Sequence, residues 1–228
     1  SIEVLSALLF NKKASFTLGD KALAMNTAAA CDNTEGTLFL LRNLTQKEKQ
    51  AFSRKYIHNL LCITTSKGNV KLTEAILNHY ASFYKQLPLK FDKLLHAANE
   101  KSYEPTLRLL FRHAPCELKP DTLNKVMLNA LDKHQFDLAI LAIVYGANPE
   151  HIQLTHAALP YFIEHLQKKT PKEIKSFFSG IQESLITERR DDIQRIYHNR
   201  TSGVWRGLID ALVGFLNSLP GINLEGYY

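Results

Sequence analysis

Three segments of the chain can be aligned without gaps at one constant spacing. They begin at Leu60, Lys93 and Val126, so the spacing is about 33 residues, within the range typical of repeat proteins. Seven columns of this alignment hold compatible core residues, and one of them contains Leu77, Leu110 and Ile143. Each segment has two helical stretches separated by a short polar break, and so short a helix pair cannot bury its apolar stripe alone. The spacing therefore predicts an array in which neighbouring helix pairs stack to form a continuous core.

The stretch FDLAILAIVYGANPE shows how one such unit ends. Phe136, Ile140 and Ile143 lie about one helical turn apart, which predicts a helix with one buried face. Gly146 is suited to cap that helix, and Pro149 three residues later prevents the helix from resuming. We therefore interpret this stretch as the second helix and exit turn of a repeat.

The repeated residues resemble the ankyrin family, whose unit has the same length, about 33 residues. The resemblance is best over 58–150, in the pieces LLHAANEKSYEPTLRLLFRHA, KGNVKLTEAIL and VYGANPE. It implies an all-α fold, an ankyrin-like solenoid of stacked helix pairs with extra helices at both ends. The units have diverged, because none has the Thr-Pro that opens the first helix in this family. Between the helices only Gly68 keeps the family's glycine, with Lys101 and His134 at the matching positions.

The chain is expected to divide into three parts. Residues 1–57 form an N-terminal helical segment that includes a degenerate first repeat, 58–182 form the ankyrin-like array, and 183–228 form a C-terminal helical cap. Within the first part, Thr45 followed by Glu48 makes a capping box that predicts a helix start. The helices predicted there cover 2–10, 19–31, 35–44 and 45–57.

A helix is also predicted in VWRGLIDALVGFLNSLPG near the C-terminus. Its apolar residues share one face, opposite Arg206 and Asp210. They are Trp205, Leu208, Ile209, Leu212, Phe215 and Leu216. This face either packs on the last repeat or binds a membrane surface or a partner's groove. We favour packing, because the polar face has few Lys or Arg residues.

The ankyrin resemblance implies binding of a partner protein through the concave face, which is built from first helices and inter-repeat loops. The alignment gives the exposed candidates on that face as His58, Asn59, Phe91, Asp92, Asn124 and Lys125. The alternative is that these are ordinary solvated positions. The sequence does not identify the partner, and we expect a monomer. The abundance of Lys, Asn, Ile, Leu and His resembles bacterial ankyrin proteins that are secreted as effectors into a host cell.

Basic residues are concentrated between Arg42 and Lys71, and Glu48 is the one acidic residue of that stretch. The whole chain has 28 basic and 22 acidic residues, a net charge of +6. This region is either an electropositive surface for anionic lipid or nucleic acid, or a solvated helix surface. Its candidate side chains are Lys47, Lys49, Arg54, Lys55, Lys67 and Lys71.

Catalytic motifs give little support to an enzyme. The sequence lacks a glycine-rich phosphate loop, a His-Glu-x-x-His motif and a Cys-x-x-Cys pair, so we expect no cofactor and no metal. A thiol hydrolase using Cys31 is one alternative, although a buried structural cysteine is the more common case at a helix end. Another is that the array recruits substrate for a larger enzyme. Cys62 falls in a core column, and Cys116 falls in a turn.

Three widely spaced cysteines favour reduced thiols and a cytoplasmic location over a disulfide framework. His151, His156 and His165 do not share a helix face at a ligand spacing. The chain has no run of about 18 uncharged apolar residues, so no transmembrane helix is predicted.

Overall fold

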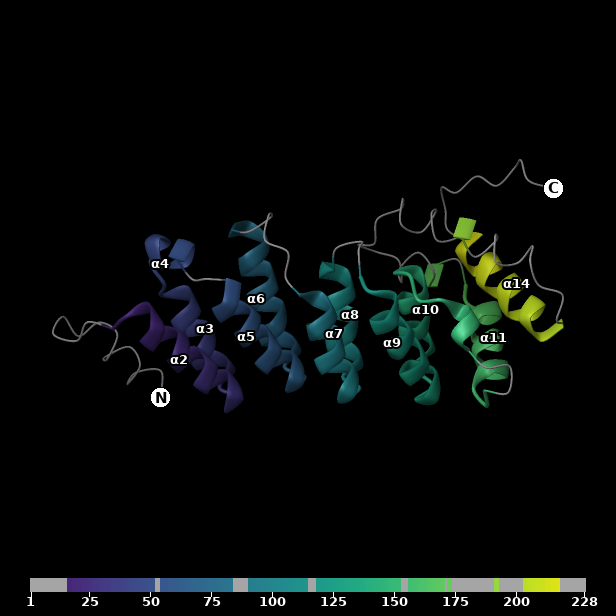
Figure 1. Cartoon of the computed structure of the whole chain (residues 1–228), viewed down its shortest axis with the longest axis horizontal. Coiled ribbons are helices and arrows are strands. Elements are labelled where there is room, and N and C mark those ends of the chain that lie inside the picture. Colours follow the sequence, from purple (N-terminus) through teal and green to yellow (C-terminus); the bar gives the residue numbers. More distant parts are fainter. Residues whose placement is uncertain are drawn as a thin grey trace. The chain divides into compact units, whose positions relative to one another are not determined.

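The computed structural model describes residues 16–51, 54–83, 90–114, 118–152, 156–170, 172–173, 191–192 and 203–217 (Figure 1). Throughout these ranges the regular structure is helical and contains no strand, which confirms the all-α class. None of the helices in them is long and apolar enough to cross a membrane. The chain divides into two compact units, residues 1–113 (unit 1) and 114–228 (unit 2).

Unit 1 consists of helix pairs arranged in two layers. Its helices are α2 (Leu18–Ala30), α3 (Thr34–Arg42), α4 (Gln46–Ala51), α5 (Arg54–Ser66), α6 (Val70–Phe83), α7 (Phe91–Glu100) and α8 (Glu104–His113). The pairs are α2 with α3, α5 with α6 and α7 with α8. The first helix of each pair packs on the first helix of the next, and α6 packs in the same way on α3 and α8 (Figure 1). The helices predicted at 19–31 and 35–44 are confirmed as α2 and α3, and the one at 2–10 lies outside the described residues.

The two helices of each pair are connected by the same kind of three-residue turn. The middle residue of the turn has a positive φ, and the N–H of the third residue donates to the carbonyl oxygen five residues earlier, as in a Schellman motif. The middle residues in unit 1 are Asp32, Gly68 and Ser102, with φ of 55°, 69° and 54°. The first turn of unit 2 has His134 there, with φ of 54°. The expectation that Lys101 matches Gly68 is therefore wrong, because Ser102 takes the left-handed conformation.

The positions of these turn residues show that the spacing between helix pairs is not constant. The interval from Gly68 to Ser102 is one position longer than the interval from Leu60 to Lys93, and the interval from Ser102 to His134 is one position shorter. An alignment at constant spacing still matches apolar residues because they occur side by side, as in Leu94-Leu95. When the helix pairs are aligned on these turn residues (the corrected register), Leu77 corresponds to Phe111. Three corrected columns are buried throughout: Leu60, Leu94 and Val126; Leu61, Leu95 and Met127; and Thr64, Ala98 and Ala130.

Side chains at the turns hold neighbouring pairs of unit 1 in register. The Asn69 side-chain nitrogen donates to Thr34 Oγ1 at 2.8 Å, which joins the second turn to the start of α3. The ring of Tyr103, in the third turn, lies against Gly68 so closely that a Cβ there would be 2.8 Å from it. Glycine at this position therefore serves both the backbone conformation and the close approach of the next turn.

In its described residues, unit 2 has one further pair and two additional helices. Its elements are α9 (Pro120–Asp132), α10 (Phe136–Val144), a 3₁₀ turn η1 (Pro149–His151), α11 (Leu159–Lys168) and α14 (Gly203–Asn217). Helix α9 packs on α10, and α11 packs on α14. The predicted exit turn is confirmed, since α10 ends before Gly146, which has φ of 120°. The Asn148 N–H then donates to Asn124 Oδ1 at 2.7 Å, which ties the exit turn to α9.

The apolar face of α14 is buried, which supports the packing interpretation of this helix. Leu208, Ile209, Leu212, Phe215 and Leu216 are buried, whereas Arg206 and Asp210 are exposed. The Trp205 side chain lies outside the described residues. Of the expected part boundaries, 57/58 falls within α5, and 182/183 lies outside the described residues.

Candidate partner-binding surface

The outer surface of the first-helix layer in unit 1 is formed by equivalent positions on three helices. In each helix these positions have the i, i+3, i+4, i+7 spacing of a single face. All are exposed or half-buried. This first-helix face consists of Leu23, Asn26, Thr27 and Ala30 on α2; Asn59, Cys62, Ile63 and Ser66 on α5; and Lys93, His96, Ala97 and Glu100 on α7.

Charge is unevenly distributed over this face. The positions on α2 and α5 carry no charged side chain, and Leu23 is 67% exposed. On α7, His96 Nε2 lies 3.4 Å from Glu100 Oε1, and both side chains are mostly exposed, so this ion pair contributes little to stability. The uncharged part of the face therefore lies on α2 and α5.

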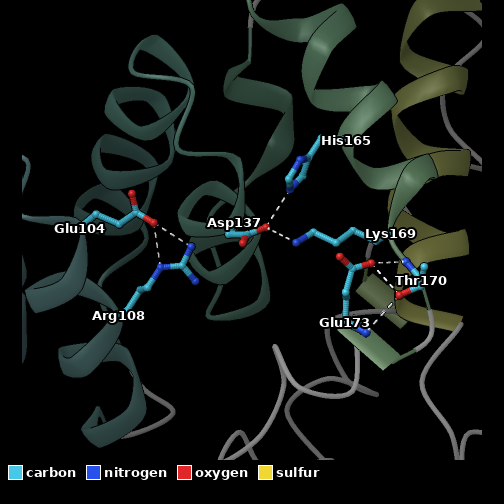
Figure 2. A network of polar contacts seen from close by, with 7 residues as sticks. All are labelled: Glu104, Arg108, Asp137, His165, Lys169, Thr170 and Glu173. Carbon is cyan, nitrogen blue, oxygen red and sulfur yellow. Dashed lines mark hydrogen bonds and ion pairs between the residues drawn. The ribbon is translucent and has the colours of Figure 1, made fainter.

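The opposite layer presents a charged surface to solvent. Its outward positions include Glu35, Arg42, Lys71, Glu74, Arg108 and Arg112. Glu104 Oε1 accepts a hydrogen bond from Arg108 Nε at 2.8 Å within α8 (Figure 2). Such i, i+4 pairs on a helix surface are typical of a solvated face. The two layers of unit 1 therefore expose surfaces of different composition.

Two of the six predicted partner-binding residues are buried, which corrects the expectation that they are exposed. Phe91 is 7% exposed and Asn124 is 8% exposed. In the corrected register His58 corresponds to Asp92 and Asn59 to Lys93, so Phe91 falls on the inner side of α7. Asn124 is buried because its side chain binds the exit turn of unit 2.

The other four predicted partner-binding residues reach the surface. His58 and Asp92 are half-buried, and Asn59 and Lys125 are exposed. Leu23, Lys93 and His96 also lie on the first-helix face, although they were not predicted from the sequence. The apolar spacing of α7 alone, read without a fixed period, could have identified the last two.

The cysteines differ from expectation. Cys62 is half-buried on the first-helix face, and its Sγ lies 3.6 Å from His58 Nε2, so its assignment to the core is wrong. Burial raises the pKa of the Cys62 thiol, and the nearby Lys93 opposes this only in part. A raised pKa favours the less nucleophilic thiol form. Cys31 is exposed and not buried as expected, and Cys116 lies outside the described residues.

The basic region between Arg42 and Lys71 does not form one surface. Lys47 and Lys49 lie on α4, before the 13-residue helix α5, and Lys67 and Lys71 follow that helix. A helix of this length is about 20 Å long. The two lysine groups therefore occupy opposite ends of the helix pairs. Arg54 and Lys55 begin α5, and their side chains lie outside the described residues.

The predicted capping box is confirmed and is tied to a neighbouring helix. The Thr45 N–H donates to Glu48 Oε2 at 2.8 Å, and the Glu48 N–H donates to Thr45 Oγ1 at 3.2 Å. Lys21 Nζ lies 2.5 Å from Glu48 Oε1, which joins the first turn of α2 to α4. Burial acts to raise the pKa of Glu48, but the bonds from Lys21 and Thr45 outweigh it and lower that pKa.

In unit 2, Asp137 at the start of α10 binds two side chains of the α11 region. His165 Nε2 lies 2.7 Å and Lys169 Nζ 2.9 Å from its carboxylate (Figure 2). The Phe136 ring packs on His165 and Phe162, with ring centres 5.3 and 5.8 Å away. These contacts fix α11 to α10, so His165 has a structural role.

The remaining candidate histidines give no metal centre. His156 Nε2 lies 3.1 Å from Asp132 Oδ1, and His151 is exposed. Within the described ranges, no group of three or more His, Cys, Asp or Glu side chains is arranged to hold a metal ion.

Comparison of the chain with protein-family models, with curated proteins and with solved structures finds no match.

Proposed function

We propose that this chain is a protein-binding module, an ankyrin-like solenoid whose partner docks on the first-helix face of unit 1. The observation that supports this most strongly is the lack of charge at the described outer positions of α2 and α5, next to a charged surface on the other layer. Charged side chains are depleted at the centres of protein interfaces because their desolvation is costly. The ankyrin resemblance adds weight, because first helices line the binding side in that family.

Within this face, Leu23 is the proposed anchor. It is the most exposed of the large apolar side chains identified as exposed in the described part of the chain. Asn59, at the corresponding position on α5, supplies hydrogen-bonding groups. A leucine among uncharged residues fits a partner surface that is itself largely uncharged. Lys93 and Glu100 on α7 would then form the charged rim.

Site-specific photocrosslinking tests this proposal. A photoreactive amino acid is placed at Asn59 on the first-helix face or, as the matched control, at Asn78, an exposed position on α6. In lysate of the source cells, we expect a defined crosslinked protein from position 59 and none from position 78. Adding Leu23→Asp should reduce that crosslink roughly tenfold, as expected for an interface anchor. Equal crosslinking from both positions, or no effect of Leu23→Asp, would contradict the proposal.

A further inference from the structure

The helix pairs of unit 1 have two chemically different ends. One end holds the three-residue turns (the turn end). The other holds the starts of α2, α5 and α7, the ends of α3, α6 and α8, and the connections between pairs, including α4 (Figure 1). We refer to it as the inter-pair end. The bond between Lys21 and Glu48 confirms that the start of α2 lies beside α4.

Five of the exposed cationic side chains that the structure describes gather at the inter-pair end. They come from the last residue of α3, from α4, from the N-cap and first turn of α7 and from the last turn of α8. They are Arg42, Lys47, Lys90, Lys93 and Arg112. Only Arg42 and Lys47 fall within the basic region recognised in the sequence. The fold adds the other three.

In the part of unit 1 that the structure describes, acidic side chains do not balance these cations. The exposed carboxylate of Asp20 accepts hydrogen bonds from Thr17 in the capping box of α2. Glu48 forms an ion pair with Lys21. The acidic side chain of Asp92 is half-buried, and so is the basic side chain of Lys49. Burial lowers the pKa of His113 at the end of α8, and the nearby Glu74 on α6 opposes this only in part, so Glu74 adds one acidic side chain at the edge of this end. The inter-pair end therefore keeps a positive excess.

The turn end has the opposite character, because its charges cancel. Its exposed lysines are Lys67, Lys71 and Lys101, and its exposed acids are Asp32, Glu35 and Glu100. Among the described residues of unit 1, the basic excess is therefore confined to the inter-pair end. Cations near the start of α7 also oppose its helix dipole, and Lys90 makes no side-chain cap there. Local helix stability does not explain their position.

An apolar side chain is exposed at the same end. Phe16 is 39% exposed and directly precedes Thr17, the N-cap of α2. Three of the five cations are lysines, which are depleted in protein interfaces, and basic clusters together with an exposed aromatic ring suit a lipid headgroup region. We propose that the inter-pair end of unit 1 binds the surface of an anionic lipid bilayer. The five cations contact headgroups, and Phe16 enters the interfacial layer.

Vesicle sedimentation of the full chain tests this proposal with a matched pair of variants. The vesicles contain phosphatidylcholine with or without phosphatidylserine. We expect sedimentation only with phosphatidylserine, and weaker binding as salt rises. The triple variant Lys47→Gln, Lys90→Gln and Lys93→Gln should bind roughly 100-fold more weakly, at about fivefold for each charge. The control triple Lys67→Gln, Lys71→Gln and Lys101→Gln removes the same charge from the turn end and should lose much less.

A second variant separates a bilayer from a nucleic acid as the ligand. Phe16→Ala should weaken vesicle binding, since the ring no longer enters the interfacial layer. Binding of the wild-type chain to a DNA duplex at the same salt should be weaker than its binding to vesicles. The proposal is overturned by equal losses in the two triple variants, by absence of vesicle binding at low salt, or by duplex binding stronger than vesicle binding.

Discussion

Units 1 and 2 use the same three-residue turn but support it differently. In unit 1 the turn at Gly68 is covered by Tyr103 of the next turn, and Asn69 bonds back to Thr34. In unit 2 the ring of His134, the middle residue of the turn, lies 5.9 Å from that of Tyr161 on α11. The turn is thus a local property of two consecutive helices. What packs against it depends on the element that follows.

The second helices of the two units differ in the same way. Helix α8 in unit 1 exposes Arg112 and partly exposes Arg108. In unit 2, α10 is buried from Leu138 to Tyr145 and has no solvent face over that stretch. An apolar helix of this kind needs cover on all sides. Helix α10 is therefore covered along this stretch, whereas α8 leaves charged side chains facing water.

The largest effect on stability is expected at the Gly68 turn of unit 1. Gly68→Ala places a Cβ on a residue with φ of 69°, 2.8 Å from the Tyr103 ring. Strain and overpacking together should lower the free energy of unfolding by about 3 kcal/mol, measured by urea denaturation. Gly214→Ala in α14 is the control, because its Cβ meets no atom within 4 Å, and it should stabilise by up to about 1 kcal/mol. Adding Tyr103→Ser to Gly68→Ala should recover part of the loss, and a Gly68→Ala protein as stable as wild type would refute this account.

The two acidic side chains that begin second helices give the next comparison. Asp137→Ala in unit 2 removes the acceptor of both His165 and Lys169 and should cost about 2 kcal/mol. Glu104→Ala in unit 1 removes only a partly exposed pair within α8 and should cost about 0.5 kcal/mol. Thermal and urea denaturation of both variants measure the difference. Equal costs would show that Asp137 does not hold α11 in place.

Glycine in place of the left-handed residue should have opposite effects in the two units. Ser102→Gly relieves an unfavourable φ of 54° and should stabilise by about 0.5 kcal/mol. His134→Gly relieves the same strain but removes ring contacts with Phe136 and Tyr161, so we expect a net loss of about 0.5 kcal/mol. Stabilisation by both substitutions, in parallel urea titrations, would mean that the ring contacts of unit 2 contribute nothing.

The smallest effect expected is the pH dependence of stability caused by His113, the last residue of α8. Burial lowers the pKa of His113 below its ordinary value of 6.5, opposed by Glu74 and assisted by Arg112. The unfolded chain therefore binds a proton at a higher pH than the folded chain, and stability falls as the pH drops through 6.5. His113→Gln should reduce this slope. Nuclear magnetic resonance titration of His113 should give a pKa below 6.5, and a value above 6.5 would reverse the predicted sign.

The sequence could predict much of the secondary structure because its signals are local. The capping box at Thr45, the exit turn at Gly146 and the helices near 19–31 and 35–44 each depend on residues within a few positions of one another. The candidate partner surface was predicted less well. A one-residue error in the register of α7 is enough to exchange buried Phe91 for half-buried Asp92, since neighbouring helix positions point about 100° apart.

By itself the sequence determined that the chain is helical, that a short polar break separates the two helices of each pair, and that short helices must share a core. Only the tertiary structure decided the unequal spacing of the turns at Gly68, Ser102 and His134. Leu94 and Leu95 suit a core position equally well, and only packing selects between them. The tertiary structure also separated Lys47 from Lys67 and brought Lys47 to the same end as Lys90 and Arg112. Periodicity is read along one helix, whereas a surface is assembled from several helices that are distant in the chain.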